Sequence, residues 1–131
     1  MIGADRPYAK KMQFYARQKN FLDQYFDGEN PSFDLPLNPH GTDYQKNVWA
    51  IMLEIPYGKF LTYGEIADQL KSHARAVGMA CGQNPIPIII PRHRALGKGG
   101  KLTDFSGGDG IKTKRYLLDL EEIYDNLKLP F

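Results

Sequence analysis

Hydrophobic residues recur at helical spacing along most of the chain, and this pattern predicts five helices. The helices cover residues 8–26, 42 to the Pro56-Tyr57-Gly58 turn, 62–70, 74–82 and 111–127. For the first, second, third and fifth helices in turn, the apolar residues are Met12, Tyr15, Leu22, Tyr25 and Phe26; Tyr44, Val48, Trp49, Met52 and Leu53; Tyr63, Ile66, Ala67 and Leu70; and Leu117, Leu118, Leu120, Ile123 and Tyr124. The helix at 74–82 carries mostly small residues. The pattern therefore predicts a mainly helical chain of amphipathic helices.

Two capping boxes indicate where the second and third helices begin. Thr42 is followed by Gln45, and Thr62 by Glu65. In such a pair each side chain accepts a hydrogen bond from a backbone N–H group at the helix start. Residues 71–73 form a turn between the third and fourth helices. Two short helices joined by a tight turn predict a helix-turn-helix, with the second as the recognition helix.

The fourth predicted helix contains two glycines, Gly78 and Gly82, among alanines. A glycine inside a helix costs about 1 kcal/mol relative to alanine, so two in one short helix indicate that another group approaches closely. That group is either a bound ligand or a neighbouring helix, and the spacing alone leaves both interpretations open.

Short extended segments complete the predicted fold. Residues 33–37 form at best an edge strand, because Pro36 has no N–H to donate. Residues 88–90 are a β-branched run that belongs to the core, and residues 94–103 suggest a hairpin through Lys98-Gly99-Gly100. The glycine-rich loop at 106–110 lacks the spacing of a phosphate-binding P-loop.

Length and composition restrict the class of protein. A chain of 131 residues with 42% hydrophobic and 24% charged residues is typical of one globular domain. No apolar run approaches the roughly 20 residues of a membrane span, and the N-terminus does not resemble a signal peptide. A single cysteine, Cys81, excludes an internal disulfide. We therefore expect an intracellular protein without membrane contact.

Positive charge is concentrated in the middle of the chain. Residues 58–115 hold ten Lys and Arg against four Asp and Glu, whereas the flanks hold seven against eleven. This asymmetry favours a polyanionic partner, although a solvated basic face has the same pattern. Three histidines and the cysteine, His40, His73, His93 and Cys81, lie at no metal-ligand spacing, so no metal or cofactor is expected.

The basic segment contains the sequence Pro91-Arg92-His93-Arg94 after a proline-punctuated apolar run. Other landmarks surround it in order: Gly41-Thr42, Val48-Trp49, Ile55-Pro56-Tyr57-Gly58, Thr62-Tyr63, Arg75-Ala76-Val77-Gly78, Asn84-Pro85 and Leu117-Leu118-Asp119-Leu120-Glu121. From residue 33 to about 122 this order resembles the DNA-binding C-terminal domain of the O6-alkylguanine-DNA alkyltransferases, the methylated-DNA protein-cysteine methyltransferases. The resemblance implies an α/β fold over residues 33–131, a mainly helical, winged helix-turn-helix-like domain with a short hairpin. Residues 1–32 would be the last helix and linker of the family's N-terminal domain.

The resemblance also implies a DNA-binding site on the helix-turn-helix. The small-faced helix would enter the minor groove, where Arg75 would take the place of the damaged nucleotide. Tyr63 would push the phosphate of that nucleotide and help to rotate the base out of the duplex. The other implied DNA contacts are Ala76, Gly78, Met79 and Arg94. The implied partner is double-stranded DNA that contains O6-alkylguanine.

In that family the alkyl group moves from guanine O6 to the cysteine thiolate of a Pro-Cys-His-Arg motif. By resemblance, His93 would be the base, acting through a water, with Glu121 orienting it and Asn84 bracing the turn. Here Arg92 stands in the cysteine's position, and a guanidinium stays protonated and offers no lone pair. Cys81 is a poor replacement, since it lies eleven residues earlier on the helix expected to face DNA. Alkyl transfer is therefore predicted to be absent.

Three functions remain open from the sequence. The first is an alkyltransferase-like sensor, which binds O6-alkylguanine without repairing it and flags it for nucleotide-excision-repair proteins. The second is a cysteine methyltransferase whose acceptor is substituted. The third is a helix-turn-helix regulator that reads a DNA sequence in the major groove, against which the small-faced helix argues.

The sensor interpretation carries further expectations. Arg92 would pair with Glu121 in the absence of DNA, and would donate hydrogen bonds to guanine O6 and N7 in its presence. The protein would be a monomer. It would lie in the cytoplasm with the nucleoid in a bacterium, or in the nucleus in a eukaryote.

Overall fold

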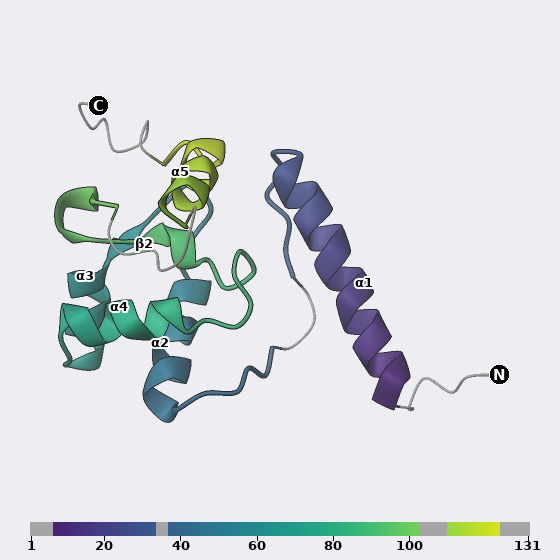
Figure 1. Cartoon of the computed structure of the whole chain (residues 1–131), viewed down its shortest axis with the longest axis horizontal. Coiled ribbons are helices and arrows are strands. Elements are labelled where there is room, and N and C mark those ends of the chain that lie inside the picture. Colours follow the sequence, from purple (N-terminus) through teal and green to yellow (C-terminus); the bar gives the residue numbers. More distant parts are fainter. Residues whose placement is uncertain (1–6, 34–36, 103–109, 124–131) are drawn as a thin grey trace. The chain divides into compact units, whose positions relative to one another are not determined.

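The structure is a computed structural model that describes residues 7–33, 37–102 and 110–123. The chain divides into two compact units, Met1–Asn38 and Pro39–Phe131, whose elements are labelled in Figure 1.

The first unit consists of one long helix and the segment after it. Helix α1, Pro7–Phe26, confirms the predicted N-terminal helix. It ends in a turn at Gly28, whose φ of +87° is a conformation that glycine adopts without steric cost. Phe33 then packs edge-to-face on Phe14 and Phe21, with ring centroids 5.5 and 6.0 Å apart. The predicted edge strand that begins at Phe33 lies largely outside the described residues.

In the described part of the second unit, four α-helices form the frame. They are α2 (Asp43–Leu53), α3 (Tyr63–Leu70), α4 (Ala74–Gly82) and α5 (Gly110–Leu120). Helices α2, α3 and α4 contact one another, and α5 lies beyond a short sheet (Figure 1). The mainly helical fold expected from the sequence is confirmed.

Both predicted capping boxes are formed. The Thr62 hydroxyl accepts a hydrogen bond from the Glu65 N–H at 3.1 Å, and the Glu65 carboxylate accepts one from the Thr62 N–H at 3.0 Å. Thr42 and Gln45 make the same reciprocal pair at the start of α2. Each cap contributes about 1 kcal/mol, which helps to explain why these helices begin where the sequence places them.

Helices α3 and α4 form the predicted helix-turn-helix. The turn closes at Lys71, which has a left-handed φ of +54°, and the Ser72 N–H donates to the Ala67 carbonyl at 2.9 Å. Sequence reasoning missed the cap of α4, where His73 Nδ1 accepts a hydrogen bond from the Ala76 N–H at 3.3 Å. This cap fixes the start of α4.

The inner faces of α2, α3 and α4 form one core. Its buried side chains are Val48, Trp49, Met52, Ile55, Ile66, Ala67, Val77, Ala80 and Cys81. The indole N–H of Trp49 donates to the Ala80 carbonyl at 2.9 Å and so fastens α2 to α4. Leu53, expected in this core, is 45% exposed, because it lies beside the stripe of positions 48, 49 and 52.

A parallel sheet forms where the sequence suggested a hairpin. Strand β1, Leu61–Thr62, pairs with β2, Ala95–Leu96, with Leu61 opposite Ala95. Within the described residues, the turn expected at Lys98–Gly100 is closed by the Gly97 N–H, which donates to the Lys101 carbonyl at 2.8 Å. The pairing with β1 prevails because it satisfies the exposed backbone groups of both short strands. It also brings residues 91–94 beside the segment that leaves α2.

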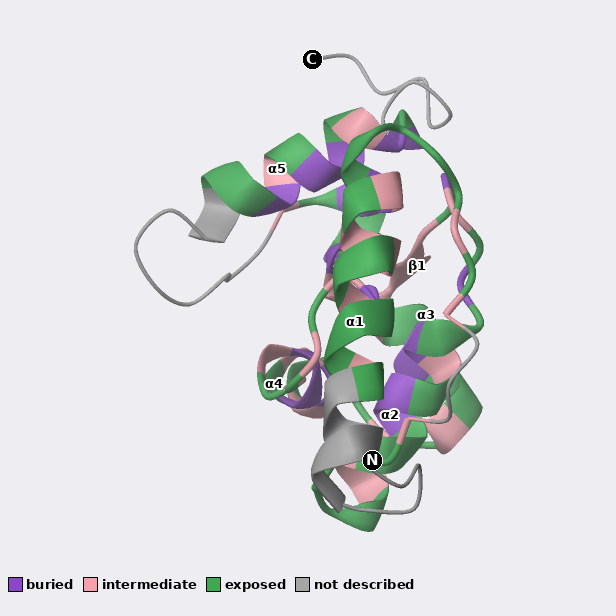
Figure 2. Ribbon diagram, turned by 90° about the vertical axis from the view of Figure 1, so that its right-hand side faces the viewer, coloured by how far each residue is buried: buried purple, intermediate pink, exposed green. Residues whose placement is uncertain are grey.

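Helix α5 covers the sheet with its buried face. Leu117 and Leu118 are buried, and Leu118 packs with Leu96 and Ile123. Figure 2 shows the buried residues of α5 gathered on one side of the helix. The helix ends at Leu120, before the predicted end at residue 127, because the chain turns at Glu122 with a φ of +59°.

None of the helices in the described residues is long and apolar enough to cross a membrane. The predicted glycine-rich loop at 106–110 lies almost wholly outside the described part of the chain.

Candidate functional site

The segment before the Pro91-Arg92-His93-Arg94 sequence is braced by Asn84. Its side-chain N–H donates to the Ile90 carbonyl at 2.7 Å, and its side-chain oxygen accepts from the Ile86 N–H at 2.8 Å. These two bonds hold a loop in which Ile89 and Ile90 are buried, as expected for core residues. The loop is not a strand, since Ile88 has a φ of +75°, rare for a β-branched residue. Asn84 thus has the bracing geometry that the resemblance implied.

Residues 92–94 form one turn of 3₁₀-helix, Arg92–Arg94, that points two side chains at Glu121, the residue directly after α5. His93 Nε2 contacts Glu121 Oε2, and both side chains are almost fully buried. Arg94 donates from Nε to Oε1 at 2.8 Å and from Nη2 to Oε2 at 3.1 Å. The Gly58 N–H is the fourth donor to the carboxylate and bonds to Oε1 at 3.0 Å. The carboxylate is therefore held at both oxygens.

The protonation states in this cluster follow from burial together with the hydrogen bonds and charges of its members. Burial opposes ionisation of Glu121, but hydrogen bonds and charges from His93 and Arg94 outweigh it and hold the pKa of Glu121 at about 2. Burial lowers the pKa of His93, and Glu121 opposes that shift only in part. The Arg94 guanidinium already balances the carboxylate, so we take His93 as neutral. A neutral imidazole that donates through Nε2 has a lone pair at Nδ1 and can accept a proton there.

Arg94 has an internal role. Besides Glu121, it donates from Nη1 to the Ile55 carbonyl at 2.8 Å, and its guanidinium lies 5.7 Å from the centre of the Tyr57 ring. The sequence analysis placed Arg94 among the DNA contacts. The structure instead commits its three nitrogen atoms to groups inside the second unit, where they join residues 92–94 to α2 and α5.

Arg92 points to a different neighbour. A side-chain carbon added at Gly82 would lie 3.5 Å from Arg92 Nη2, which places the guanidinium against the C-terminal end of α4. The expected pairing of Arg92 with Glu121 is wrong, because Gly58, His93 and Arg94 occupy the roughly four lone-pair positions of that carboxylate.

Tyr63 and Lys114 meet on the same side of α4. A side-chain carbon at Gly78 would lie 3.8 Å from the Tyr63 ring, an ordinary van der Waals distance, so Tyr63 packs beside this glycine without requiring it. Lys114 Nζ lies 3.3 Å from the Tyr63 hydroxyl and donates to the Ala95 carbonyl at 2.7 Å. Sequence reasoning missed Lys114. Its spacing could have revealed it, because position 114 shares the buried face of α5 with positions 117, 118 and 121.

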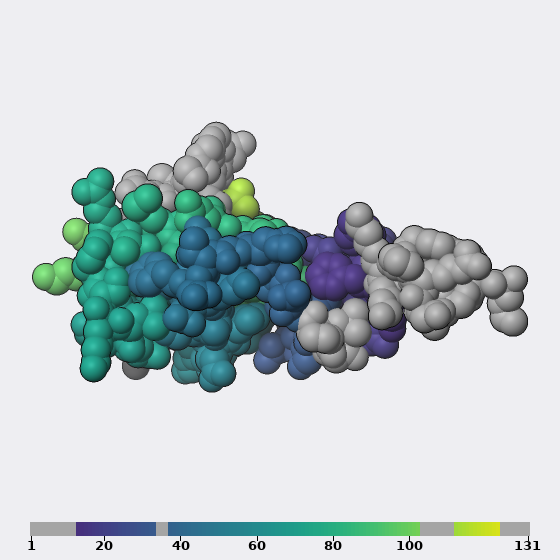
Figure 3. Space-filling model, turned by 90° about the horizontal axis from the view of Figure 1, so that it is seen from below, coloured from purple at the N-terminus to yellow at the C-terminus, as the bar shows by residue number. Residues whose placement is uncertain are grey.

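The outer side of α4 carries the remaining implied DNA contacts. Arg75 is exposed, Met79 is 62% exposed, and Ala76 between them is partly buried. In Figure 3 the teal-green atoms of this region stand at one edge of the unit. Small side chains leave the backbone of α4 open to close approach by a ligand.

Cys81 lies on the opposite, core-facing side of α4. It is fully buried with its sulfur 3.5 Å from Met52 Sδ, and burial raises the pKa of its thiol to about 12. A thiol in this setting stays protonated at neutral pH, so Cys81 is a packing residue.

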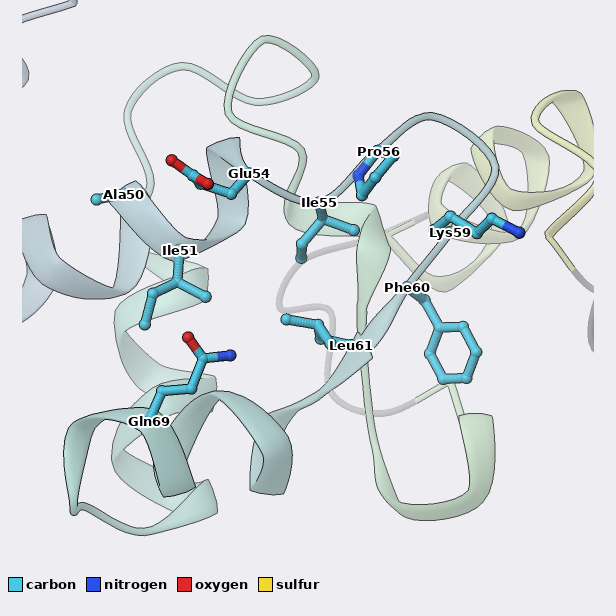
Figure 4. Close-up of a pocket in the computed structure, with 9 residues that line it drawn as sticks. All are labelled: Ala50, Ile51, Glu54, Ile55, Pro56, Lys59, Phe60, Leu61 and Gln69. Carbon is cyan, nitrogen blue, oxygen red and sulfur yellow. The ribbon is translucent and has the colours of Figure 1, made fainter.

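A separate cavity of about 540 Å³, lined by both apolar and polar side chains, lies on the second unit. Figure 4 shows Ile51, Ile55 and Leu61 converging on it from α2, the segment after α2, and β1, with Gln69 of α3 nearby. None of the candidate site residues lines this cavity, so it is distinct from the site. Among the described residues, no three His, Cys, Asp or Glu side chains are grouped to hold a metal ion.

Residues 43–123 match the family model described as 6-O-methylguanine DNA methyltransferase, DNA binding domain. The chain belongs to this family. The matched residues include α2, the helix-turn-helix, residues 91–94 and Glu121, so the resemblance noted in the sequence is confirmed.

Relatives with a known activity are similar over much of this chain. The methylated-DNA–protein-cysteine methyltransferase of Mycobacterium tuberculosis is 53% identical over 103 residues, which are 77% of this chain and 61% of that protein. The enzyme of the same name from Methanosarcina mazei is 44% identical over 123 residues, 92% of this chain and 75% of that protein. The chain thus spans about three fifths of the mycobacterial relative.

Two solved structures of the family contain DNA. Mycobacterium tuberculosis OGT in complex with DNA is 50% identical with a TM-score of 0.75, over 82% of this chain and 67% of that one. Schizosaccharomyces pombe Atl1, in complex with damaged DNA containing O6-carboxymethylguanine, is 29% identical with a TM-score of 0.56, over 64% of this chain and 80% of that one. These similarities confirm the expected fold class of the second unit.

Proposed function

We propose that this family member binds duplex DNA through α3 and α4 and holds O6-alkylguanine without accepting the alkyl group. The observation that carries the proposal is Arg92, a guanidinium at the position of the family's acceptor thiol. It stays protonated and cannot attack an alkyl carbon. Cys81 supplies no substitute, because it is buried and its thiol has a pKa of about 12.

The outer side of α4 is the proposed DNA contact. The exposed Arg75 and the small Ala76 and Gly78 fit a helix that enters a narrow groove, and Arg75 would stack in the space left by a rotated base. Tyr63, which packs against Gly78, stands beside that helix. The DNA complexes of the two similar structures support a DNA partner.

A lesion that is held without being repaired has to be removed by other proteins. Nucleotide-excision-repair proteins are therefore the class of partner that this proposal implies. The bound complex would mark the site, because flipping a damaged base leaves a distorted duplex.

The proposal is tested by the affinities for two matched short duplexes, one with guanine and one with O6-methylguanine, at one fixed moderate salt concentration. We expect tighter binding of the lesion and no gain in protein mass afterwards. Arg75→Ala should bring the affinity ratio towards one, whereas Lys46→Ala, an exposed change on α2, should leave it unchanged. Equal binding of both duplexes contradicts the proposal, and a footprint on one specific sequence supports a regulator instead.

One observation favours a second function, a cysteine methyltransferase whose acceptor is substituted. The His93–Glu121 pair that would activate a thiol at position 92 is intact. With Cys at that position, His93 would take the thiol proton through a water, and the thiolate would attack the alkyl carbon. The new S–C bond would form as the C–O6 bond breaks, and the guanine that remains in the DNA would take up a proton.

Restoring the acceptor separates the two functions. Arg92→Cys should gain one methyl group per protein from O6-methylguanine DNA, as read by intact mass, and Arg92→Ser should gain none. If the unaltered protein already prefers the lesion, the sensor function stands. If only Arg92→Cys distinguishes the two duplexes and takes up the methyl group, the chain is a substituted methyltransferase.

A further inference from the structure

Two glycines one turn apart, Gly78 and Gly82, form what we call the glycine face of α4. Tyr63 lies against the first of them and Arg92 against the second. Residues four apart in a helix share one face, so the phenol ring and the guanidinium lie along the same side of α4. Arg92 is only partly buried, which leaves its guanidinium within reach of a ligand on that side.

A second cation lies beside the glycine face. Lys114 is fully buried, with Nζ bonded to the Ala95 carbonyl and 5.6 Å from the centre of the Tyr63 ring. Burial is the main cause that lowers the pKa of Lys114 to about 8, and the neighbouring charge of Arg92 acts in the same direction. Arg92 and Lys114 both carry positive charge, so an anion bound beside them would be attracted by each.

We propose that the site is selective for O6-guanine adducts that end in a carboxylate, with Arg92 as the residue that pairs with that carboxylate. The inference rests on the proposed binding of O6-alkylguanine DNA and names the class of adduct. A guanidinium matches a carboxylate in plane and charge and binds it through two parallel hydrogen bonds. A neutral adduct of the same size offers no charge to Arg92 or Lys114.

The partly buried setting strengthens this pairing. An ion pair gains more where water is partly excluded, as it is between α4 and residues 92–94. Lys114 contributes as a point charge held by Ala95 and Tyr63, without having to touch the adduct. Arg92 thus turns the former acceptor position into a specificity position.

The test uses four duplexes that differ only at one base: guanine, O6-methylguanine, O6-(2-hydroxyethyl)guanine and O6-carboxymethylguanine. The hydroxyethyl adduct is the neutral control of similar size. At one fixed salt concentration, we expect the carboxymethyl duplex to bind about tenfold or more tighter than the hydroxyethyl duplex, the size of one charge-assisted hydrogen bond.

Two variants identify the residue responsible. Arg92→Gln should abolish the carboxymethyl preference and keep the preference of O6-methylguanine over guanine. Arg115→Gln removes a cation of the same helix as Lys114 whose side chain is 43% exposed, and it should keep the carboxymethyl preference. Circular dichroism of both variants checks that they are folded.

The outcomes separate this inference from the proposed function. Equal affinity for the carboxymethyl and hydroxyethyl duplexes overturns the inference. So does a loss in Arg92→Gln that is the same for all four duplexes, because Arg92 would then contact a DNA phosphate. Failure of the proposed function gives a different result, namely equal affinity for the O6-methylguanine and guanine duplexes.

Discussion

Arg94 and Glu121 are joined by two hydrogen bonds inside the second unit, from Nε to Oε1 at 2.8 Å and from Nη2 to Oε2 at 3.1 Å. The Glu121 side chain has no exposed surface, and that of Arg94 is 12% exposed. This pair ties residues 92–94 to α5. It therefore helps to set the position of Arg92 and His93.

Removal of Arg94 should be strongly destabilising. Arg94→Met leaves the Glu121 carboxylate buried beside only one side-chain donor, and we expect a loss of about 3–5 kcal/mol in the free energy of unfolding, measured with urea. Arg115→Met is the matched control, because Arg115 makes an exposed pair with Asp119 and should cost less than about 1 kcal/mol. Similar small losses in both variants would show that the buried pair is not needed.

Acid should destabilise the protein through the same cluster. Because the pKa of Glu121 is held at about 2, below its ordinary 4.5, the unfolded chain binds this proton more readily than the folded one. The stability from Glu121 is present above about pH 4.5 and is lost as the pH falls towards 2. His93, whose pKa burial lowers from 6.5, acts in the same direction below about pH 6.5.

Urea unfolding between pH 7 and pH 3 checks this sign. Glu121→Gln should be less stable than the unaltered protein at pH 7 and should lose less stability below pH 4.5. Parallel curves for the two proteins would mean that another acid group controls the transition.

Cys81 should be unreactive until the chain unfolds. Its burial and its pKa of about 12 leave almost no accessible thiolate, so a disulfide reagent at pH 7.5 should label the folded protein at least about 100-fold more slowly than the urea-unfolded one. Cys81→Ala gives the blank. Rapid labelling of the folded protein would return Cys81 to consideration as an alkyl acceptor.

Gly41 and Gly64 should respond differently to alanine. A side-chain carbon at Gly41 would lie 2.6 Å from Trp49 Cη2, so Gly41→Ala forces the indole to shift and should cost about 1–3 kcal/mol. At Gly64, in the first turn of α3, the nearest atom would be Thr62 Oγ1 at 3.9 Å. Gly64→Ala should therefore be neutral or stabilise by up to about 1 kcal/mol, as thermal unfolding would measure. Equal effects at both sites would contradict the packing around Trp49.

The sequence by itself determined the features that depend on neighbouring residues. The capping boxes at Thr42 and Thr62 and the apolar stripes predicted the helices, because these patterns act within a few residues of chain. The order of landmarks identified the family, and the residue at position 92 raised the question of transfer. The same stripes wrongly predicted that Leu53 is buried, because the spacing of apolar residues defines a helix face but not how much of that face packs against other elements.

Tertiary structure alone decided which distant groups meet. The parallel pairing of β1 with β2 depends on the path of the chain between them, which no local pattern encodes, and the same path buries Lys114 against Ala95 and Tyr63. The partner of Glu121 was decided in the same way. A 3₁₀ turn directs successive side chains about 120° apart, so Arg94 and His93 meet Glu121 while Arg92 lies against Gly82.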